Sequence, residues 1–206
     1  SANLINYTEV FNFSQLEEYQ SVAVRTLMGQ AKETKPQILH SASNFVVGLA
    51  GAEAAKRLGI PSVYEIRGFW HLTQATKRLG YEASDHYNLS EHLEFEAARN
   101  SDHVFTITNA LRDILLENGI EPEKVSVLPN AVNPERFDIS PRDEELEDEL
   151  GYGGKVVIGY IGSFVEYEGL ELLMEAVAQL KNELGDVFRV LMVGDGSVHE
   201  KLRRMT

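Results

Sequence analysis

Apolar residues recur along this chain in two alternating patterns: short runs typical of buried strands, and longer stretches with the spacing of a helix. The clearest example is residues 155–184. Here the apolar run 156–161 predicts a buried strand, and a helix is predicted after it from the apolar positions Leu170, Leu173, Met174, Val177 and Leu184. A glycine-marked loop, 162–169, joins the two. The stretch is therefore predicted to form half of a βαβ unit.

The residues before this stretch alternate in the same way. Helices are expected over 15–34, 44–58, 90–100 and 109–117. Strands are expected over 36–41, 60–66, 103–107 and 125–128. Gly59 reads as a helix C-cap, and Ser90 and Thr108 read as N-caps. Strands separated by helices of this length pair in parallel with right-handed crossovers, so the fold class is α/β, with a Rossmann-like parallel sheet and flanking helices.

The pattern breaks between 134 and 154, which contain Pro141, the acidic run 143–149 and three glycines. A fresh βαβ unit begins at Lys155, and its second strand is expected at 187–193. We therefore predict a partial first domain over 1–137, an acidic linker over 138–154, and the start of a second Rossmann-like domain over 155–206.

Residues 72–88 are polar and irregular, which is typical of a mobile loop or lid. His86 and His92 lack the spacing of a metal site and are expected at the surface. The carboxylates on the helix that follows are expected to form a solvated face: Glu91, Glu94 and Glu96.

The net charge of −13 is unevenly distributed. Residues 1–100 carry 9 Lys and Arg against 11 Asp and Glu, whereas residues 101–206 carry 10 against 21. A chain this acidic lacks the cationic face that nucleic acid requires. There is no cysteine, no apolar run of membrane-spanning length and no leader-like start, which together favour a cytoplasmic protein.

Five residues that follow the second predicted strand directly, Arg67 to His71, carry chemistry suited to a ligand. The carboxyl edge of an open parallel sheet is where such folds bind ligands. Arg67 could hold a phosphate or carboxylate, and Gly68 would allow close approach. The imidazole of His71 could move protons near neutral pH. The alternative is structural: Arg67 pairs with Glu65 or an acidic neighbour, while Phe69 and Trp70 pack in the core.

The loop 162–169 offers a second candidate site, because a helix N-terminus after a parallel strand attracts anions such as a nucleotide diphosphate. Neither a complete G-x-G-x-x-G nor a Walker pattern is present, so the glycines could equally serve turn geometry alone.

Taken in order, several segments make the chain resemble the retaining GT-B glycosyltransferases of the group-1 class, family 4. These segments are I-L-H-S-A-S, A-A-K-R-L-G-I-P-S-V, V-F-T-I-T-N-A-L-R-D-I-L, V-L-P-N-A-V-N-P-E-R-F, I-G-Y-I-G-S-F-V-E-Y-E-G-L and L-M-V-G-D-G-S-V-H-E-K-L. The resemblance implies two Rossmann-like domains facing a cleft, the first for an acceptor and the second for a nucleotide-sugar donor.

The resemblance also implies roles for particular residues. The donor diphosphate would be held by Gly162, Ser163 and Gly169 with the helix that starts there. The acceptor side or the interdomain junction would include Arg67, Gly68, His71 and Asn130. No catalytic residue is assigned beyond Arg67 and His71 as candidates. No cofactor or metal is implied.

The chain departs from the family pattern at several positions. Asn130-Ala131-Val132-Asn133 replaces the usual N-G-V-D, and Arg67 replaces a histidine. Ser163 and Glu168 stand where an Arg and a Lys commonly hold the diphosphate, and a glutamate beside a diphosphate is electrostatically unfavourable. The family's E-x7-E motif would fall beyond Thr206 and its first glycine-rich loop before Ser1. We therefore expect a fragment that has weak or no activity alone.

The favoured function is transfer of a hexose from a nucleotide-sugar to a glycan or lipid-linked acceptor, with retention of configuration at the anomeric carbon. The resemblance also implies peripheral association of the parent enzyme with the inner face of a membrane. A nucleotide-sugar 2-epimerase of GT-B fold and a non-catalytic binding module remain open. A nicotinamide-dependent oxidoreductase is disfavoured, because its glycine fingerprint and ribose-binding acid are incomplete.

Overall fold

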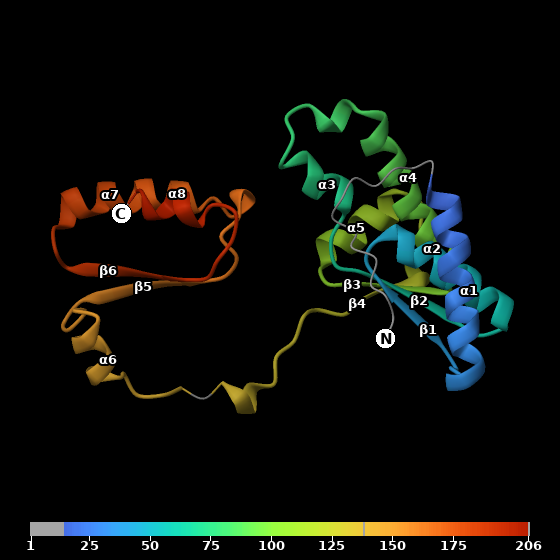
Figure 1. Cartoon of the computed structure of the whole chain (residues 1–206), viewed down its shortest axis with the longest axis horizontal. Coiled ribbons are helices and arrows are strands. Elements are labelled where there is room, and N and C mark those ends of the chain that lie inside the picture. The colour runs from blue at the N-terminus through green and yellow to red at the C-terminus, as the bar shows by residue number, and fades with distance from the viewer. Residues whose placement is uncertain (1–14, 138, 206) are drawn as a thin grey trace. The chain divides into compact units, whose positions relative to one another are not determined.

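The computed structural model describes residues 15–137 and 139–205 and divides into two compact units (Figure 1). The first extends to Val132 and the second begins at Asn133. The α/β fold class with parallel sheets is confirmed.

The first unit alternates helices and strands. Its helices are α1 (Leu16–Thr34), α2 (Phe45–Leu58), α3 (Trp70–Ala75), α4 (Asp85–Asn100) and α5 (Asn109–Glu117), with 3-10 turns at Tyr81–Ala83 and Pro122–Lys124. Its strands are β1 (Leu39–Ala42), β2 (Ser62–Ile66), β3 (His103–Thr106) and β4 (Val125–Val127). The four strands pair in parallel in the order β1-β2-β3-β4, so each right-handed crossover places its helix on the same face of the sheet.

Small residues let helix α2 lie close to the sheet and to α4. A side-chain carbon added at Gly48 would lie 2.8 Å from the Tyr64 ring and 3.0 Å from Ala97. At Gly51 it would lie 2.0 Å from the hydroxyl of Ser41. The alanine and glycine content of this helix is therefore a packing requirement, and the helix sits over the centre of the core.

A fully buried carboxyl group, that of Glu94 on α4, links three elements of this core. One oxygen accepts a short hydrogen bond from the Tyr64 hydroxyl on β2. The other accepts from the backbone N–H of Phe45, the first residue of α2, at 3.2 Å. Burial raises the pKa of Glu94 to about 7, although both hydrogen bonds act in the opposite direction. The expectation that Glu94 belongs to a solvated face is therefore wrong.

The structure also corrects the expected loop at 72–88. Helix α3 and a 3-10 turn occupy much of this range, and α4 begins at Asp85. Ser84 is its N-cap, accepting from the Tyr87 N–H at 3.2 Å, whereas the predicted cap Ser90 is buried inside the helix. Short helical turns with polar sequences have weak periodicity, which is why the pattern misses them. His86 and His92 are exposed, as expected.

The second unit contains α6 (Glu144–Glu149), β5 (Val156–Ile161), α7 (Leu170–Leu184), β6 (Phe188–Val193) and α8 (His199–Arg203), with 3-10 turns at Pro134–Arg136 and Glu166–Glu168. The strands β5 and β6 are parallel, which confirms the predicted βαβ unit. Its small core consists of Phe164, Leu170, Val198 and Leu202.

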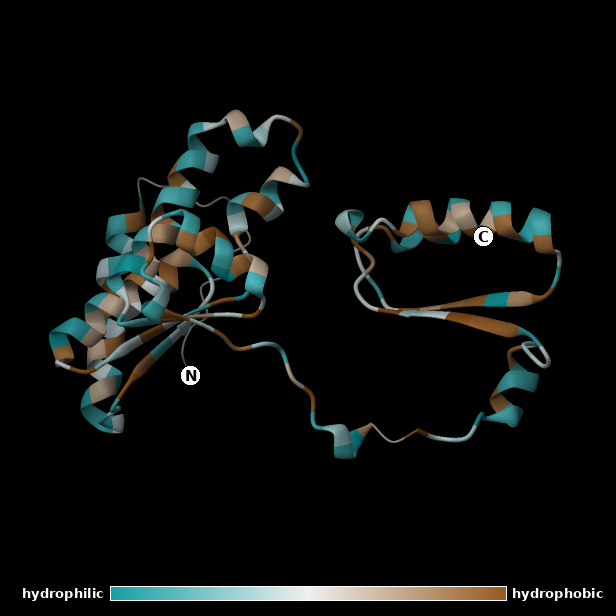
Figure 2. Ribbon diagram, turned by 180° about the vertical axis from the view of Figure 1, so that it is seen from behind, coloured by the Kyte–Doolittle hydropathy of each residue, from teal (hydrophilic) through white to brown (hydrophobic). Residues whose placement is uncertain are grey.

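Strand β5 is not buried in this structure, contrary to the prediction. Val156 is 65% exposed and Ile161 is 84% exposed. Figure 2 shows β5 and β6 as largely hydrophobic ribbons. A two-stranded sheet leaves apolar side chains of this kind uncovered, because burying both faces of a parallel sheet takes more strands and helices than the described residues supply.

Two glycine-containing loops lie in contact at the carboxyl ends of these strands. A side-chain carbon at Gly194 would lie 1.9 Å from the carbonyl oxygen of Gly162. Beside them, the Phe164 N–H donates to the Asp195 carbonyl at 2.9 Å and the Val198 N–H donates to the Phe164 carbonyl at 3.0 Å. The loop after β5 is thus held by the loop after β6.

The buried carboxyl of Glu94 leads to a pH-dependent prediction. Its folded pKa is raised, so the stability it contributes is greatest below its unfolded pKa and declines as pH rises through about 7. Glu94→Gln keeps a neutral hydrogen-bonding group and should match the wild type near pH 5. At pH 8 the variant should be the more stable protein by about 2 kcal/mol. Denaturant unfolding across this pH range measures the difference.

Because both proteins retain the other titrating groups, their difference isolates Glu94. Glu96→Gln, a change of the same kind at a half-buried position on the same helix, should shift the free energy of unfolding little at either pH. A difference between Glu94→Gln and wild type that does not vary with pH would contradict the assignment.

The paired loops lead to a steric prediction. Gly194→Ala places a methyl group against the backbone of Gly162 and should destabilise the second unit by about 1–3 kcal/mol. The hydrogen-exchange rate of the Phe164 amide measures this loss of stability directly. The control is Gly159→Ala, where no atom lies within 4 Å of the added carbon. Equal exchange rates in the two variants would show that the loop contact carries no stability.

Candidate functional site

The carboxyl edge of the first sheet is organised around Ser43, which follows β1. The Ser43 N–H donates to the Glu65 carbonyl at 2.9 Å, and the Ser43 hydroxyl accepts from the Arg67 N–H at 2.9 Å. Two helices begin at this edge with side-chain caps: Asn44 accepts from Val46 at α2, and Thr108 accepts from Leu111 at α5. These bonds fix the chain where it leaves the sheet, and so position Arg67.

The side chain of Arg67 is held by Glu65. The guanidinium Nε donates to Glu65 Oε1 at 2.6 Å, and Nε2 of His40 lies 2.9 Å from the other carboxylate oxygen. The Arg67 contact lowers the pKa of Glu65 most, so the carboxylate is ionised at neutral pH. The Arg67–Glu65 pair and the buried Phe69 agree with the structural alternative, whereas Trp70, which that alternative places in the core, is 37% exposed. The pair leaves the two terminal nitrogens of Arg67 without a hydrogen-bond partner among the described residues, and the side chain is 61% exposed. An oriented, exposed guanidinium can still bind an anion.

The remaining residues of the 67–71 segment are placed differently. No atom lies within 4 Å of a side-chain carbon built at Gly68, so the space in front of it is open. His71 is only 2% exposed and its ring stacks on Phe69, with centroids 5.5 Å apart. Its Nδ1 has no hydrogen-bond partner in the part of the chain that the structure describes. Burial lowers the pKa of His71 to about 4, so the ring is neutral at physiological pH. This placement favours a structural role, and a direct role of His71 stays a prediction.

Asn130 lies in the extended segment after β4 and is exposed. It follows the carboxyl end of a strand of the same sheet as Arg67 and Gly68, where a junction residue was expected. No hydrogen bond of its side chain to another described residue is seen, and its functional assignment stays a prediction.

In the second unit, one loop carries Gly162, Ser163 and Gly169. Gly162 directly follows β5, and Gly169 is the N-cap of α7 with φ +69°, a left-handed conformation that favours glycine. No side chain caps the N-terminus of α7, in contrast to α2, α4, α5 and α6. The first N–H groups of α7 thus have no side-chain acceptor, which is the arrangement that suits an anion.

The charged side chains near this loop disfavour the binding of an anion there. Glu168 is exposed immediately before Gly169, and it is one of the groups that raise the pKa of Tyr160, after the desolvation of that ring. Glu166 accepts a hydrogen bond from the Ser197 hydroxyl at 3.1 Å. The nearby cation Lys201 is already paired with Glu171 at 2.5 Å. A bound diphosphate would therefore depend on backbone N–H groups and the Ser163 hydroxyl more than on cations.

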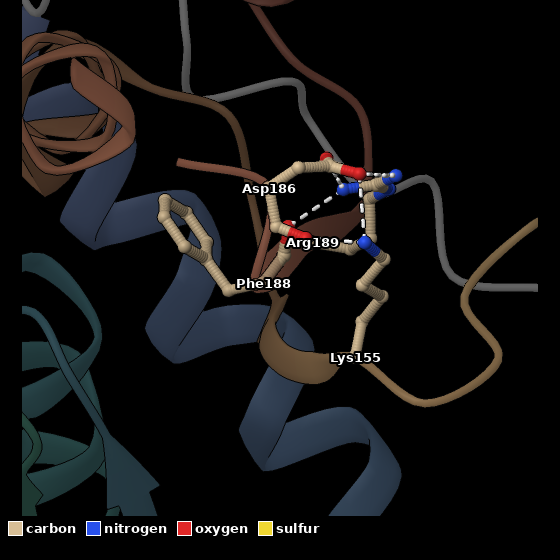
Figure 3. A network of polar contacts seen from close by, with 4 residues as sticks. All are labelled: Lys155, Asp186, Phe188 and Arg189. Atoms are coloured by element: carbon tan, nitrogen blue, oxygen red, sulfur yellow. Dashed lines mark hydrogen bonds and ion pairs between the residues drawn. The ribbon is translucent and has the colours of Figure 1, made fainter. Parts of the chain in front are cut away.

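The main ionic cluster of this unit lies at the other end of its strands (Figure 3). Asp186, just before β6, contacts Lys155 Nζ at 2.7 Å and Arg189 Nη1 at 2.5 Å. These hydrogen bonds hold the pKa of Asp186 well below its usual range. Lys155 precedes β5, so the cluster joins the amino ends of the two strands and does not belong to the glycine loop.

Sequence reasoning missed two contributors to the first edge, Ser43 and His40, and gave the Arg67–Glu65 pair only as an alternative. The alternation of side chains along β2 places Glu65 and Arg67 on the same face, and that signal could have identified the pair as more than an alternative. The contact with His40 depends on the register between β1 and β2, which no local pattern reveals. Among the described residues, no three His, Cys, Asp or Glu side chains are arranged to hold a metal ion.

None of the helices within 15–137 and 139–205 has the length and apolar character needed to cross a bilayer.

Comparison with known proteins identifies similar sequences. At 30% identity over 158 residues, the chain is similar to 2-deoxystreptamine glucosyltransferase of Streptomyces kanamyceticus, covering 72% of this chain and 38% of the relative. It is also 26% identical over 172 residues to a GDP-mannose-dependent alpha-mannosyltransferase of Mycobacterium tuberculosis, covering 82% of this chain and 41% of the relative. The chain thus spans well under half the length of these relatives.

Solved structures share the fold. HepE from Anabaena, crystallised with UDP, has a TM-score of 0.68 at 20% identity, over 88% of this chain and 48% of that one. A UDP-GlcNAc 2-epimerase from Neisseria meningitidis has a TM-score of 0.55 at 18% identity, over 95% of this chain and 52% of that one. At these identities the likeness is one of fold.

Family profiles cover nearly the whole sequence. The Glycosyltransferase Family 4 profile matches residues 3–136, and the Glycosyl transferases group 1 profile matches residues 141–206. The two matches follow each other in the order that the sequence resemblance implies. This chain therefore belongs to the family 4, group-1 glycosyltransferases.

Proposed function

We propose that the whole protein transfers a hexosyl group from a nucleotide diphosphate sugar to a glycan or lipid-linked acceptor, with retention of configuration. The observation that carries the proposal is the glycine loop at the uncapped N-terminus of α7, at the carboxyl end of β5. Membership of the glycosyltransferase family supports assigning this loop to the nucleotide-sugar. Among the relatives, one is named as dependent on GDP-mannose, and the similar HepE structure was obtained with UDP.

The chemistry of transfer explains why this loop matters. As the bond to the sugar breaks, negative charge develops on the departing diphosphate. N–H groups at the start of α7 and the hydroxyl of Ser163 can stabilise that charge without a metal ion. The loop after β6 contacts the glycine loop through Gly194 and keeps its N–H and hydroxyl groups in place. Little reorganisation of these hydrogen-bond donors is therefore needed when charge develops on the diphosphate.

On the first unit, the exposed nitrogens of Arg67 and the open space beside Gly68 would receive the acceptor. Glu65 keeps the guanidinium oriented, so Arg67 is proposed as a binding residue. His71, buried and neutral, would support the backbone of this segment.

Family membership favours glycosyl transfer over a nucleotide-sugar 2-epimerase and over a non-catalytic module. The decisive experiment incubates the whole protein with labelled UDP-glucose or GDP-mannose and candidate acceptors, and analyses the products. Transfer with retained configuration supports the proposal. Release of an epimerised sugar would identify an epimerase, and the absence of any product with every donor would favour the module.

We expect the 206 residues by themselves to show little or no turnover under the same conditions. The reason is that β5 is left largely exposed by the described residues of the second unit, so the loop is supported by a sheet of two strands only. Robust turnover by this chain alone would contradict that expectation and leave the proposed reaction intact.

The acidic loop gives a prediction about donor binding by this chain. Glu168→Gln removes a negative charge next to the N-terminus of α7 and should strengthen UDP binding about two- to five-fold. Titration with UDP, followed through the amide NMR shifts of Gly162, Ser163 and Gly169, measures the affinity even when it is weak.

The matched control is Glu183→Gln, the same change at an exposed position near the other end of α7. It should leave UDP affinity unchanged. If UDP perturbs amides elsewhere and not those of the loop, or if Glu168→Gln weakens binding, the diphosphate is not held here.

A further inference from the structure

A groove between two helices of the first unit gathers positive charge in an otherwise acidic chain. Helix α2 packs against both α1 and α4 (Figure 1), and the groove, here called the α1–α2 groove, has a volume of about 670 Å³. Its cationic side chains are Arg25 of α1 and Lys56 and Arg57 of α2. Because the whole chain carries a net charge of −13, this concentration of cations is a local departure from its composition.

Helical spacing explains why these side chains line one groove. Residues three or four apart lie on the same face of a helix. On α1, Ser21 and Arg25 have this spacing, and on α2 so do Glu53, Lys56 and Arg57. The face that each helix turns to the other therefore carries the charged rim of the groove.

The cations are largely available to a ligand. The Nε of Arg57 donates to Glu53 Oε1 at 2.7 Å, which orients the guanidinium and leaves its terminal nitrogens without a partner among the described residues. Within 15–137 and 139–205, the side chains of Arg25 and Lys56 take part in no hydrogen bond or ion pair. An oriented guanidinium and two unpaired cations can bind a phosphate group through charge-assisted hydrogen bonds.

A structural role explains only part of this arrangement. Lys56 and Arg57 lie in the last turn of α2, where cations stabilise the C-terminus of a helix. Arg25 lies in the middle of α1, where that effect does not act. Lys56 also follows Asn44 by twelve residues, which is about 18 Å along a helix at about 1.5 Å per residue. The cations of α2 are thus remote from the carboxyl edge where α2 begins.

The rest of the lining indicates what else the ligand carries. Glu17 and Glu53 also line the groove, so a ligand that is anionic throughout would be repelled. Carboxylates accept hydrogen bonds from hydroxyl groups, and the amide of Asn100 can both donate and accept. Val24 and Ala50 are buried and form a small apolar floor. The volume lies in the range of small-molecule sites, roughly 300–1,000 Å³.

We propose that the α1–α2 groove binds a small phosphorylated sugar or polyol. The phosphate lies against Arg25, Lys56 and Arg57, and the hydroxyl groups lie against Glu17 and Asn100. The groove shares no residue with the glycine loop proposed for the donor or with the segment of Arg67. The inference therefore goes beyond sugar transfer, and either can hold without the other.

Glucose 6-phosphate is the probe, and glucose and inorganic phosphate are the comparisons. The 206-residue chain is titrated with each compound, and binding is followed through the amide NMR shifts of Ser21, Arg25, Lys56 and Arg57. Glucose 6-phosphate should shift these amides and should bind at least about five-fold more tightly than either comparison, because only it uses both the cations and the hydroxyl acceptors. Added salt should weaken its binding.

Two variants and one control locate the contact. Arg25→Gln and Lys56→Gln should each lower the affinity for glucose 6-phosphate about five-fold. Lys32→Gln removes an equal charge from the last turn of α1, outside the groove, and should leave the affinity unchanged. All three side chains are exposed, so the variants should fold as the wild type does, which thermal unfolding without ligand checks.

Three results would each overturn the proposal. Inorganic phosphate or glucose could bind as tightly as glucose 6-phosphate, or Lys32→Gln could weaken binding as much as Arg25→Gln. Alternatively, glucose 6-phosphate could leave the amides of the groove unshifted and perturb those of the glycine loop. Donor binding is measured separately by the UDP titration, so a failure here leaves the proposed transfer reaction standing.

Discussion

The first unit depends on one buried carboxyl group. Glu94 receives hydrogen bonds from β2 and from the start of α2, so a single side chain of α4 ties this strand to this helix. Burying a carboxyl group is costly unless its oxygens are satisfied, and here both are. The same bond to Phe45 fixes the chain one residue after Asn44, where β1 leaves the sheet. The carboxyl edge of the first sheet is thus joined to α4 by a hydrogen bond whose acceptor is a titratable group.

Glycine residues have different roles in the two units. In α2, Gly48 and Gly51 allow a helix to approach a tyrosine ring and a serine hydroxyl closely. In the second unit, Gly194 lets two loops touch at the ends of their strands. The first use builds a core and the second holds a candidate ligand loop in one conformation. Neither use matches a nucleotide-binding fingerprint, which is why a motif search finds little in a chain whose profile matches are nearly continuous.

Much of the fold could be predicted from the sequence, because its longer elements have strong periodicity and recognisable ends. The helix 109–117 with its Thr108 cap, the strand 156–161 and the helix 170–184 lie where expected. What failed depended on tertiary structure: the burial of Glu94, the helical turns between 70 and 83, and the exposure of β5. For the site, local order predicted that Arg67 and the glycine loop lie at strand ends. The Glu65 and His40 contacts required the strand register, and the roles of Arg67, Gly162 and Asn130 await experiment.

Five rings lie in consecutive contact between α4 and residue 81, with centroids 4.9 to 6.1 Å apart, in the order Phe95, Phe69, His71, Tyr87 and Tyr81. Rings in mutual contact transmit displacement because packed side chains compress little. Residues 67–81 are therefore supported by a continuous series of packed rings that begins on α4. The ring at the inner end of the series is that of Phe95, the residue next to Glu94, so the series begins where α4 is hydrogen-bonded to β2 and to α2.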